Sequence, residues 1–81
     1  MNREEIVNER LNDPRCYLYL KVPPTYFEKF VRHLNSSPFC YVSRNYHDGL
    51  WLCHVVYVGN IDYLPEELFF LGRWFERHGI S

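Results

Sequence analysis

The dipeptide Asp48-Gly49 constrains this chain more than any other feature, because it separates two apolar segments. Residues 39–46 and 50–58 on either side of it are rich in aromatic and β-branched side chains, a composition typical of strands. Asp-Gly is favoured in two-residue hairpin turns, in which both turn residues need a positive φ. The sequence therefore predicts a β-hairpin with Asp48 and Gly49 as its turn.

This turn also fixes the register of the hairpin. Residues that lie directly opposite each other share a face of the sheet, and the predicted pairs are His47–Leu50, Tyr46–Trp51, Asn45–Leu52, Arg44–Cys53, Ser43–His54, Val42–Val55, Tyr41–Val56 and Cys40–Tyr57. Cys53 and His54 are neighbours in one strand, so they should point to opposite faces. Cys40 and Cys53 should share a face but lie roughly 13 Å apart at the usual strand rise, too far for a disulfide.

Periodicity predicts the remaining elements. Residues 15–22 alternate between two faces, which indicates a strand with Cys16, Leu18, Leu20 and Val22 on one side and Tyr17, Tyr19 and Lys21 on the other. A short helix is expected over residues 3–11 behind an Asn2–Glu5 capping box. A second helix is expected from a Thr25–Glu28 capping box to Leu34, with the core stripe Tyr26, Phe27, Phe30, Val31 and Leu34.

The last helix should begin at Pro65, run to about His78 and stop at Gly79. Its expected inner stripe is Leu64, Leu68, Leu71 and Phe75, and Gly72 is expected to allow close approach to the sheet. The order of elements is α-β-α-β-β-α. With a right-handed crossover, it predicts an α+β fold with a three-stranded sheet of order 1-3-2, two helices on one face and a short N-terminal helix. This is a split βαβ, an incomplete ferredoxin-like arrangement without its fourth strand.

Length and composition limit the possible classes of protein. The 81 residues suit a single domain, divided into an N-terminal helix or arm over 1–14 and a βαββα core over 15–81. Nine basic against ten acidic residues argue against a duplex-DNA binder, which is usually basic. No apolar run reaches the length of a membrane span, and three cysteines without paired spacing fit a reducing, cytoplasmic location.

Enzyme and metal chemistry have little support in the sequence. The chain contains no C-x-x-C, H-x₃-H, G-x-S-x-G or Gly-rich phosphate loop. We therefore expect no catalytic residue, no metal ligand and no cofactor, and an enzyme or metal protein built from Cys and His is the least favoured reading. Cys16 would approach His54 only if the first strand lies beside the third. His54 itself is expected to be half-buried and bonded to Ser43 or to the backbone.

The predicted faces suggest a binding site. The aliphatic side of the first strand should meet the helices together with Phe39, Tyr41, Leu52, Val56 and Val58. The opposite face would then gather aromatic and basic side chains in an exposed patch: Tyr17, Tyr19, Lys21, Arg44, Tyr46, Trp51 and Tyr57, with Val42 and Val55. Large exposed apolar patches usually mark interaction sites. A second candidate surface lies on the last helix at Phe70, Arg73, Trp74 and Arg77.

Three interpretations of the sheet patch remain open. The first, which the near-balanced charge favours, is a protein-binding surface, either for a homodimer or for another protein. The second is single-stranded RNA or DNA, because aromatics beside basic residues can stack on bases. In the third, the N-terminal helix covers the patch and makes it a second core layer. The sequence thus favours a non-enzymatic, self-associating protein-binding module, a small intracellular regulator or inhibitor of the kind that phages and mobile elements direct against host machinery.

Overall fold

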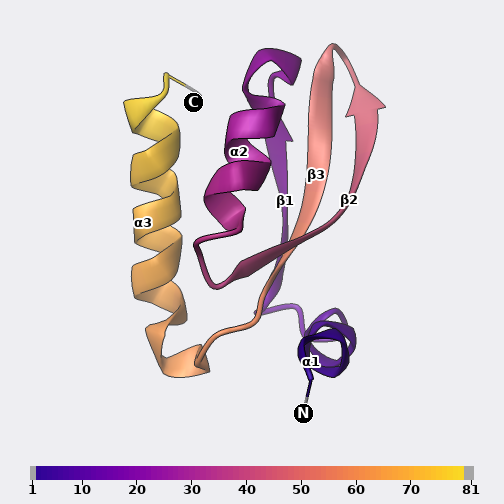
Figure 1. Cartoon of the computed structure of the whole chain (residues 1–81), viewed down its shortest axis with the longest axis vertical. Coiled ribbons are helices and arrows are strands. Elements are labelled where there is room, and N and C mark those ends of the chain that lie inside the picture. The colour runs from indigo at the N-terminus through magenta and orange to yellow at the C-terminus, as the bar shows by residue number, and fades with distance from the viewer. Residues whose placement is uncertain (1, 80–81) are drawn as a thin grey trace.

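The computed structural model describes residues 2–79 and contains three helices and a three-stranded sheet (Figure 1). The helices are α1 (Arg3–Arg10), α2 (Phe27–Leu34) and α3 (Leu64–Arg77), and the strands are β1 (Tyr17–Val22), β2 (Phe39–His47) and β3 (Leu50–Tyr57). Two short 3₁₀ helices, η1 (Pro24–Tyr26) and η2 (Ile61–Tyr63), precede α2 and α3. The predicted α+β fold class is confirmed.

The sheet has the predicted order β1-β3-β2, and both pairs of neighbouring strands are antiparallel. In the hairpin turn, Asp48 has a φ of 52° and Gly49 a φ of 81°, so both residues adopt the positive φ that a type I′ turn requires. The predicted pairing holds from His47–Leu50 back to Ser43–His54. The short Asp-Gly turn is therefore sufficient to set the register near the hairpin end.

Beyond Ser43 the predicted register is wrong by one residue. The pairing moves from Ser43–His54 directly to Tyr41–Val55, which leaves Val42 as the extra residue of a β-bulge. Such a residue shifts everything that precedes it to the other side of the strand. Tyr41 therefore points toward the helices, as predicted, but its partner is Val55 rather than Val56. Cys40 pairs with Val56, so Cys40 and Cys53 lie on opposite faces and not on the same one.

The predicted division of β3 between the two faces is also wrong. The helix-facing side of β1 pairs with β3 as Leu18–Val55, Leu20–Cys53 and Val22–Trp51. Since paired residues share a face, the helices cover Trp51, Cys53, Val55 and Tyr57, and the other face carries Leu52, His54 and Val56. The sequence argument placed the two strands of the hairpin correctly against each other only between the turn and Ser43–His54. It did not fix how β1 aligns with them.

Helices α2 and α3 lie on one face of the sheet, with α2 nearer the strands (Figure 1). Phe30 and Leu34 of α2 and Leu71 of α3 are buried in the core. The predicted Thr25–Glu28 capping box does not form, because η1 occupies residues 24–26 and α2 begins at Phe27 without a side-chain cap. Helix α3 matches its prediction more closely, with Pro65 in its first turn and a left-handed Gly79 after its end.

Helix α1 covers one end of the opposite sheet face. The backbone N–H of Glu5 donates to the Asn2 side chain at 2.8 Å, which confirms the predicted N-terminal cap. The Arg3 side chain donates to Cys40 Sγ at 3.1 Å, and Val56 beside it is fully buried. The helix thus makes a second core layer at this end only, and Tyr19 and Lys21 remain exposed.

Two residues of α3 differ from their predicted roles. Leu68 was assigned to the inner stripe but is 40% exposed. Gly72 was expected to approach the sheet closely, but a Cβ atom at this position would meet no atom within 4 Å. Both observations show that the side of α3 toward β1 is not covered by the described part of the chain.

Candidate interaction surfaces

The structure divides the predicted sheet patch between the two faces. Only Tyr17, Tyr19 and Lys21 lie on the face opposite α2 and α3, where β3 contributes His54. The Tyr19 ring stacks on the His54 imidazole at 4.6 Å between ring centres, and Tyr17 meets the same imidazole edge-on at 5.7 Å. His54 Nε2 is buried without a hydrogen-bond partner, so the expected bond from this atom to Ser43 or to backbone is not made.

The basic and aromatic residues at the hairpin end form a separate cluster on the helix side. The Arg44 guanidinium carbon lies 4.0 Å from the centre of the Trp51 ring and 4.2 Å from that of Phe27 in α2. A guanidinium within about 6 Å of an aromatic face is attracted by the ring. Tyr46 meets Trp51 edge-on at 5.2 Å. Trp51 is therefore held in the packing between the hairpin and α2 and is not a freely exposed anchor.

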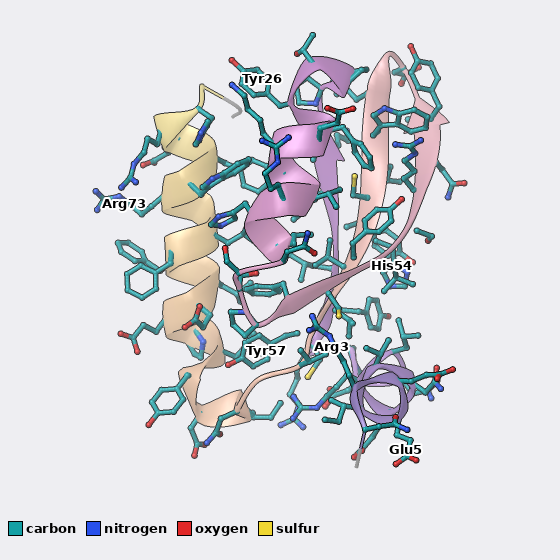
Figure 2. All side chains as sticks on the ribbon, viewed as in Figure 1. Arg3, Glu5, Tyr26, His54, Tyr57 and Arg73 are labelled. Carbon is teal, nitrogen blue, oxygen red and sulfur yellow. The ribbon has the colours of Figure 1, made fainter. Side chains whose placement is uncertain are left out.

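Tyr57 is not a surface residue. Its side chain is almost completely buried, and its hydroxyl donates to the Asn60 carbonyl at 2.7 Å. Burial raises the pKa of this phenol, and the nearby Glu67 carboxylate raises it further. Tyr57 thus belongs to the core, on the side where α3 begins (Figure 2).

Helix α3 carries two adjacent exposed phenylalanines. Phe69 is 60% exposed and Phe70 53%. The two rings meet at 6.0 Å, and the Arg73 guanidinium lies 5.8 Å from the Phe69 ring centre. We define the α3 surface as Phe69, Phe70, Arg73, Trp74 and Arg77. The sequence prediction contained all of these except Phe69, which the helical spacing from Arg73 and from the inner stripe could have revealed.

Trp74 joins the α3 surface to α2. Its indole lies 4.8 Å from the His33 imidazole, with 14° between the planes, and 4.3 Å from that of His78. His33 was expected on the solvent side of α2 but is half-buried here. Burial lowers the pKa of His33, and the charge of a protonated His78 would lower it further. Trp74 is thus partly a packing residue and only partly available to a partner.

The cations around this surface have no carboxylate partners. Within residues 2–79, ion pairs form only between Arg15 and Asp13 and between His47 and Asp48. Four cations of the two helices therefore have no carboxylate partner: Lys29, Arg32, Arg73 and Arg77.

Carboxylates gather at the other end of the molecule. They lie on α1, on η2 and in the first turn of α3, at the lower end in Figure 1: Glu4, Glu5, Glu9, Asp62, Glu66 and Glu67. The upper end holds the C-terminal half of α3 and the start of α2. Although the net charge is only −1, the acidic and basic side chains are thus unevenly distributed along the molecule.

The cysteine and histidine side chains do not assemble into a reactive group. Cys16 accepts a hydrogen bond from the Arg10 side chain of α1 at 3.4 Å, whereas the His54 imidazole packs against Tyr17 and Tyr19. Cys16, Cys40 and Cys53 are all free thiols, and burial raises the pKa of Cys53. The described residues contain no group of three His, Cys, Asp or Glu side chains placed to hold a metal ion.

None of the helices within residues 2–79 combines the length and the apolar character that a membrane crossing requires. Comparison with protein-family models, curated proteins and solved structures gives no match. A function must therefore be inferred from the surfaces of the chain itself.

Proposed function

We propose that this chain is a non-enzymatic protein-binding module, and that it binds its partner through the α3 surface. The observation that carries the proposal is the exposed pair Phe69 and Phe70 in the middle of α3. A small domain that has few large side chains to spare for its core nevertheless leaves two phenylalanines in water. Exposed apolar patches of this kind usually mark interaction sites.

The residue types of the α3 surface suit a binding hot spot. Aromatic side chains each bury a large area on binding, and aromatic and Arg residues are enriched in protein interfaces. Arg73 beside Phe69 and Arg77 one turn further place two guanidinium groups next to the aromatic pair. Since these cations have no ion pair in the described chain, a partner's carboxylates would not have to displace an internal one.

The proposal extends to self-association and to cellular location. An isologous contact between two α3 surfaces would cover both phenylalanine pairs at once, so a homodimer is the simplest partner. Three free thiols are compatible with a reducing compartment, and we propose a cytoplasmic role. A module without catalytic groups would act as a small regulator or inhibitor, by occupying a surface that its partner needs.

The experiment compares a variant that lacks the exposed aromatic pair of the α3 surface with a variant that lacks an exposed aromatic side chain outside it. The first is the double substitution Phe69→Ser and Phe70→Ser. The control is Tyr63→Ser, because Tyr63 is 58% exposed but lies in η2, outside the α3 surface. Sedimentation equilibrium at several concentrations measures self-association. A photo-crosslinking phenylalanine analogue at position 69, and separately at position 19, tests for a different partner in a lysate of the producing cell.

The double variant Phe69→Ser/Phe70→Ser should have an association constant at least tenfold lower and a nearly unchanged thermal midpoint. In the crosslinking experiment, crosslinks should form from position 69 only. Tyr63→Ser should associate like the original chain. Equal association of all three proteins, together with no crosslink from position 69, would refute the proposal. A crosslink from position 19 alone would show that the partner binds the open face of the sheet instead.

The alternative is binding of single-stranded nucleic acid on the open sheet face. Its support has weakened, because Arg44, Tyr46, Trp51 and Tyr57 lie on the helix side of the sheet. What favours it is Tyr19, which is 55% exposed, stacks on His54 and has Lys21 as a neighbour on the same face. Quenching of tyrosine fluorescence by a short single-stranded oligonucleotide, absent in Tyr19→Ala, would distinguish it.

A further inference from the structure

Strand β1 has one unpaired edge. The sheet order β1-β3-β2 places β1 at the margin, where it pairs with β3 on one side and with no strand of the described chain on the other. A free edge presents a row of backbone N–H and C=O groups that can accept another strand. Proteins often blunt such an edge with a bulge, a proline or a lysine. Strand β1 has Lys21 near its end and Pro23 just after it, but it has no bulge and is regular from Tyr17 to Val22.

The edge opens into a groove under α3. A cleft of about 480 Å³ lies between the sheet and α3. It is lined on the sheet side by Leu20, Lys21, Pro23 and Leu50, and on the side of α3 and its end by Gly72, Phe75, Glu76 and Gly79. Leu18 and Leu20 face the helices but remain half-exposed, and Leu68 of α3 is also exposed. The described chain therefore shields these aliphatic side chains only partly from solvent.

Gly72 supplies the second observation. A glycine in the middle of a helix costs about 1 kcal/mol relative to alanine, and a close neighbour usually explains it. Here a Cβ atom would meet nothing within 4 Å, so the rest of the described chain does not require the glycine. Gly72 lines both the groove beside β1 and the adjoining hollow with Leu68 and Glu76. It keeps the groove open along the side of α3.

The shape of the groove selects its occupant. A second copy that paired its own β1 here would bring its α3 to the same side of the joined sheet. Its α3 would then compete for the space that the first α3 already occupies above the edge. A single extended segment needs only the width of one strand, about 4.8 Å from β1, and can lie between β1 and α3. The groove therefore fits an extended peptide rather than another folded copy.

Charge indicates the chemistry of that peptide. A strand paired with β1 would alternate between the helix side and the open side. Toward the helices it meets Leu18, Leu20 and the space at Gly72, which suit apolar side chains. The Glu76 carboxylate also lines the groove on the α3 side, so an acidic side chain would be repelled there and belongs on the open side. Toward the open face it meets Lys21, which is exposed and has no ion pair within residues 2–79. A peptide in which apolar and acidic residues alternate therefore suits both the helix side and the open side of the added strand.

We propose that the groove between β1 and α3 is a strand-addition site, and that it binds an extended segment of a partner protein in which apolar and acidic residues alternate. Backbone hydrogen bonds to the β1 edge provide the affinity and alternate side chains the specificity. The occupant completes a four-stranded sheet. The groove itself shares no residue with the α3 surface, and only the adjoining hollow is also lined by Phe69 and Arg73. The two proposals rest on different observations.

The test uses the full chain and three synthetic nine-residue peptides. Each has valine at every second position, and the positions between carry glutamate, threonine or lysine. A fourth peptide has the composition of the first, with its valines and glutamates in two blocks. Amide chemical shifts of the ¹⁵N-labelled chain are followed during titration to 1 mM. The same titration is repeated with Gly72→Trp, which fills the groove, and with Tyr63→Ser as a control, because Tyr63 is exposed but lies in η2, away from the groove and from the α3 surface.

The expected result is that the glutamate peptide shifts the amides of β1, Gly72 and Gly79, and binds at least tenfold more tightly than the lysine peptide. Gly72→Trp should weaken its binding at least tenfold, and Tyr63→Ser should leave it unchanged. Absence of shifts in β1, or unchanged binding to Gly72→Trp, would overturn the site. Equal affinity of the four peptides would overturn the acidic, alternating partner. If the β1 amide signals broadened with increasing protein concentration in the absence of any peptide, the edge would bind a second copy of the chain instead.

Discussion

The imidazole of His33 lies face to face with the indole of Trp74, with ring centres 4.8 Å apart. This stack is the main aromatic contact between the exposed sides of α2 and α3, and below it Phe30 packs against Phe75 at 5.6 Å. The relative position of the two helices therefore depends on an ionisable ring. Lys29, Arg32 and His78 line the same groove, so protonation of His33 would add a charge beside existing cations.

The stability of the protein should consequently fall on mild acidification. The pKa of His33 is lowered in the folded protein, first by burial and then by His78. The unfolded chain then binds a proton near pH 6.5, before the folded chain does, so the free energy of unfolding decreases as the pH falls through this window. His33→Phe keeps the stack without the titration. Urea denaturation between pH 7.5 and 5 should show a shallower decrease for the variant, and equal slopes would contradict the prediction.

Trp51 and Tyr19 should respond differently to truncation, although the sequence placed them on one surface. Trp51→Ala removes the contacts with Phe27 and Arg44 and should cost about 2 kcal/mol, less than a fully buried aromatic. Tyr19→Ala removes an exposed ring stacked on His54 and should cost less than about 1 kcal/mol. Thermal or urea unfolding measures both. A larger loss for Tyr19→Ala would show that the open face is a true core layer.

Tyr57 and Gly59 should be energetically coupled. Tyr57→Phe leaves the Asn60 carbonyl without its donor and should cost about 1–2 kcal/mol. A Cβ atom at Gly59 would lie 2.7 Å from the Tyr57 hydroxyl, 2.8 Å from Tyr57 Cζ and 3.1 Å from Pro38 Cβ, so Gly59→Ala should cost about 1–3 kcal/mol through overpacking. In the double variant the contact with the hydroxyl is absent and only the contact with the ring remains. Its loss should therefore be smaller than the sum of the single losses, and strict additivity would argue against the contact.

Deletion of Val42 should be tolerated, which is unusual inside a strand. Val42 is the extra residue of the bulge, so its removal joins Tyr41 to Ser43 in a regular ladder without changing which face either residue occupies. The expected loss is about 1–2 kcal/mol, from a half-buried valine and a straighter strand. Amide spectra should retain the cross-strand contacts of Tyr41 with Val55. Global unfolding of the deletion variant would show that the bend itself is required.

The sequence predicted the fold where local signals were strong. The Asp48-Gly49 turn, the alternation of β1 and the periodicity of α2 and α3 were sufficient for the element order, because turn geometry and amphipathic periodicity act over a few residues. The bulge at Val42 could not be predicted in this way. Both Tyr41 and Val42 are apolar, so the hydrophobic pattern permits either register.

The candidate site was harder to predict because it depends on how distant segments align. The Leu18–Val55 pairing of β1 with β3 is not encoded in any turn, and a shift of one residue exchanges whole faces. The predicted sheet patch was lost for this reason. The residues on α3 were predicted more reliably, since a helical face follows from spacing within one element. The groove beside β1 combines a missing strand with a distant helix, and no local pattern reveals it.

The separation of charge between the two ends of the molecule has a kinetic consequence. A chain with a net charge of −1 has little overall attraction for an acidic partner, but its uneven charge gives it an electric dipole. Such a field orients a charged partner before contact and raises the rate of productive encounter, an effect that salt screens over about 8 Å at physiological ionic strength. Helix α3 contributes to this dipole, with Glu66 and Glu67 at one end and Arg73 and Arg77 toward the other. The dipole thus affects the association rate of a charged partner and its orientation on approach.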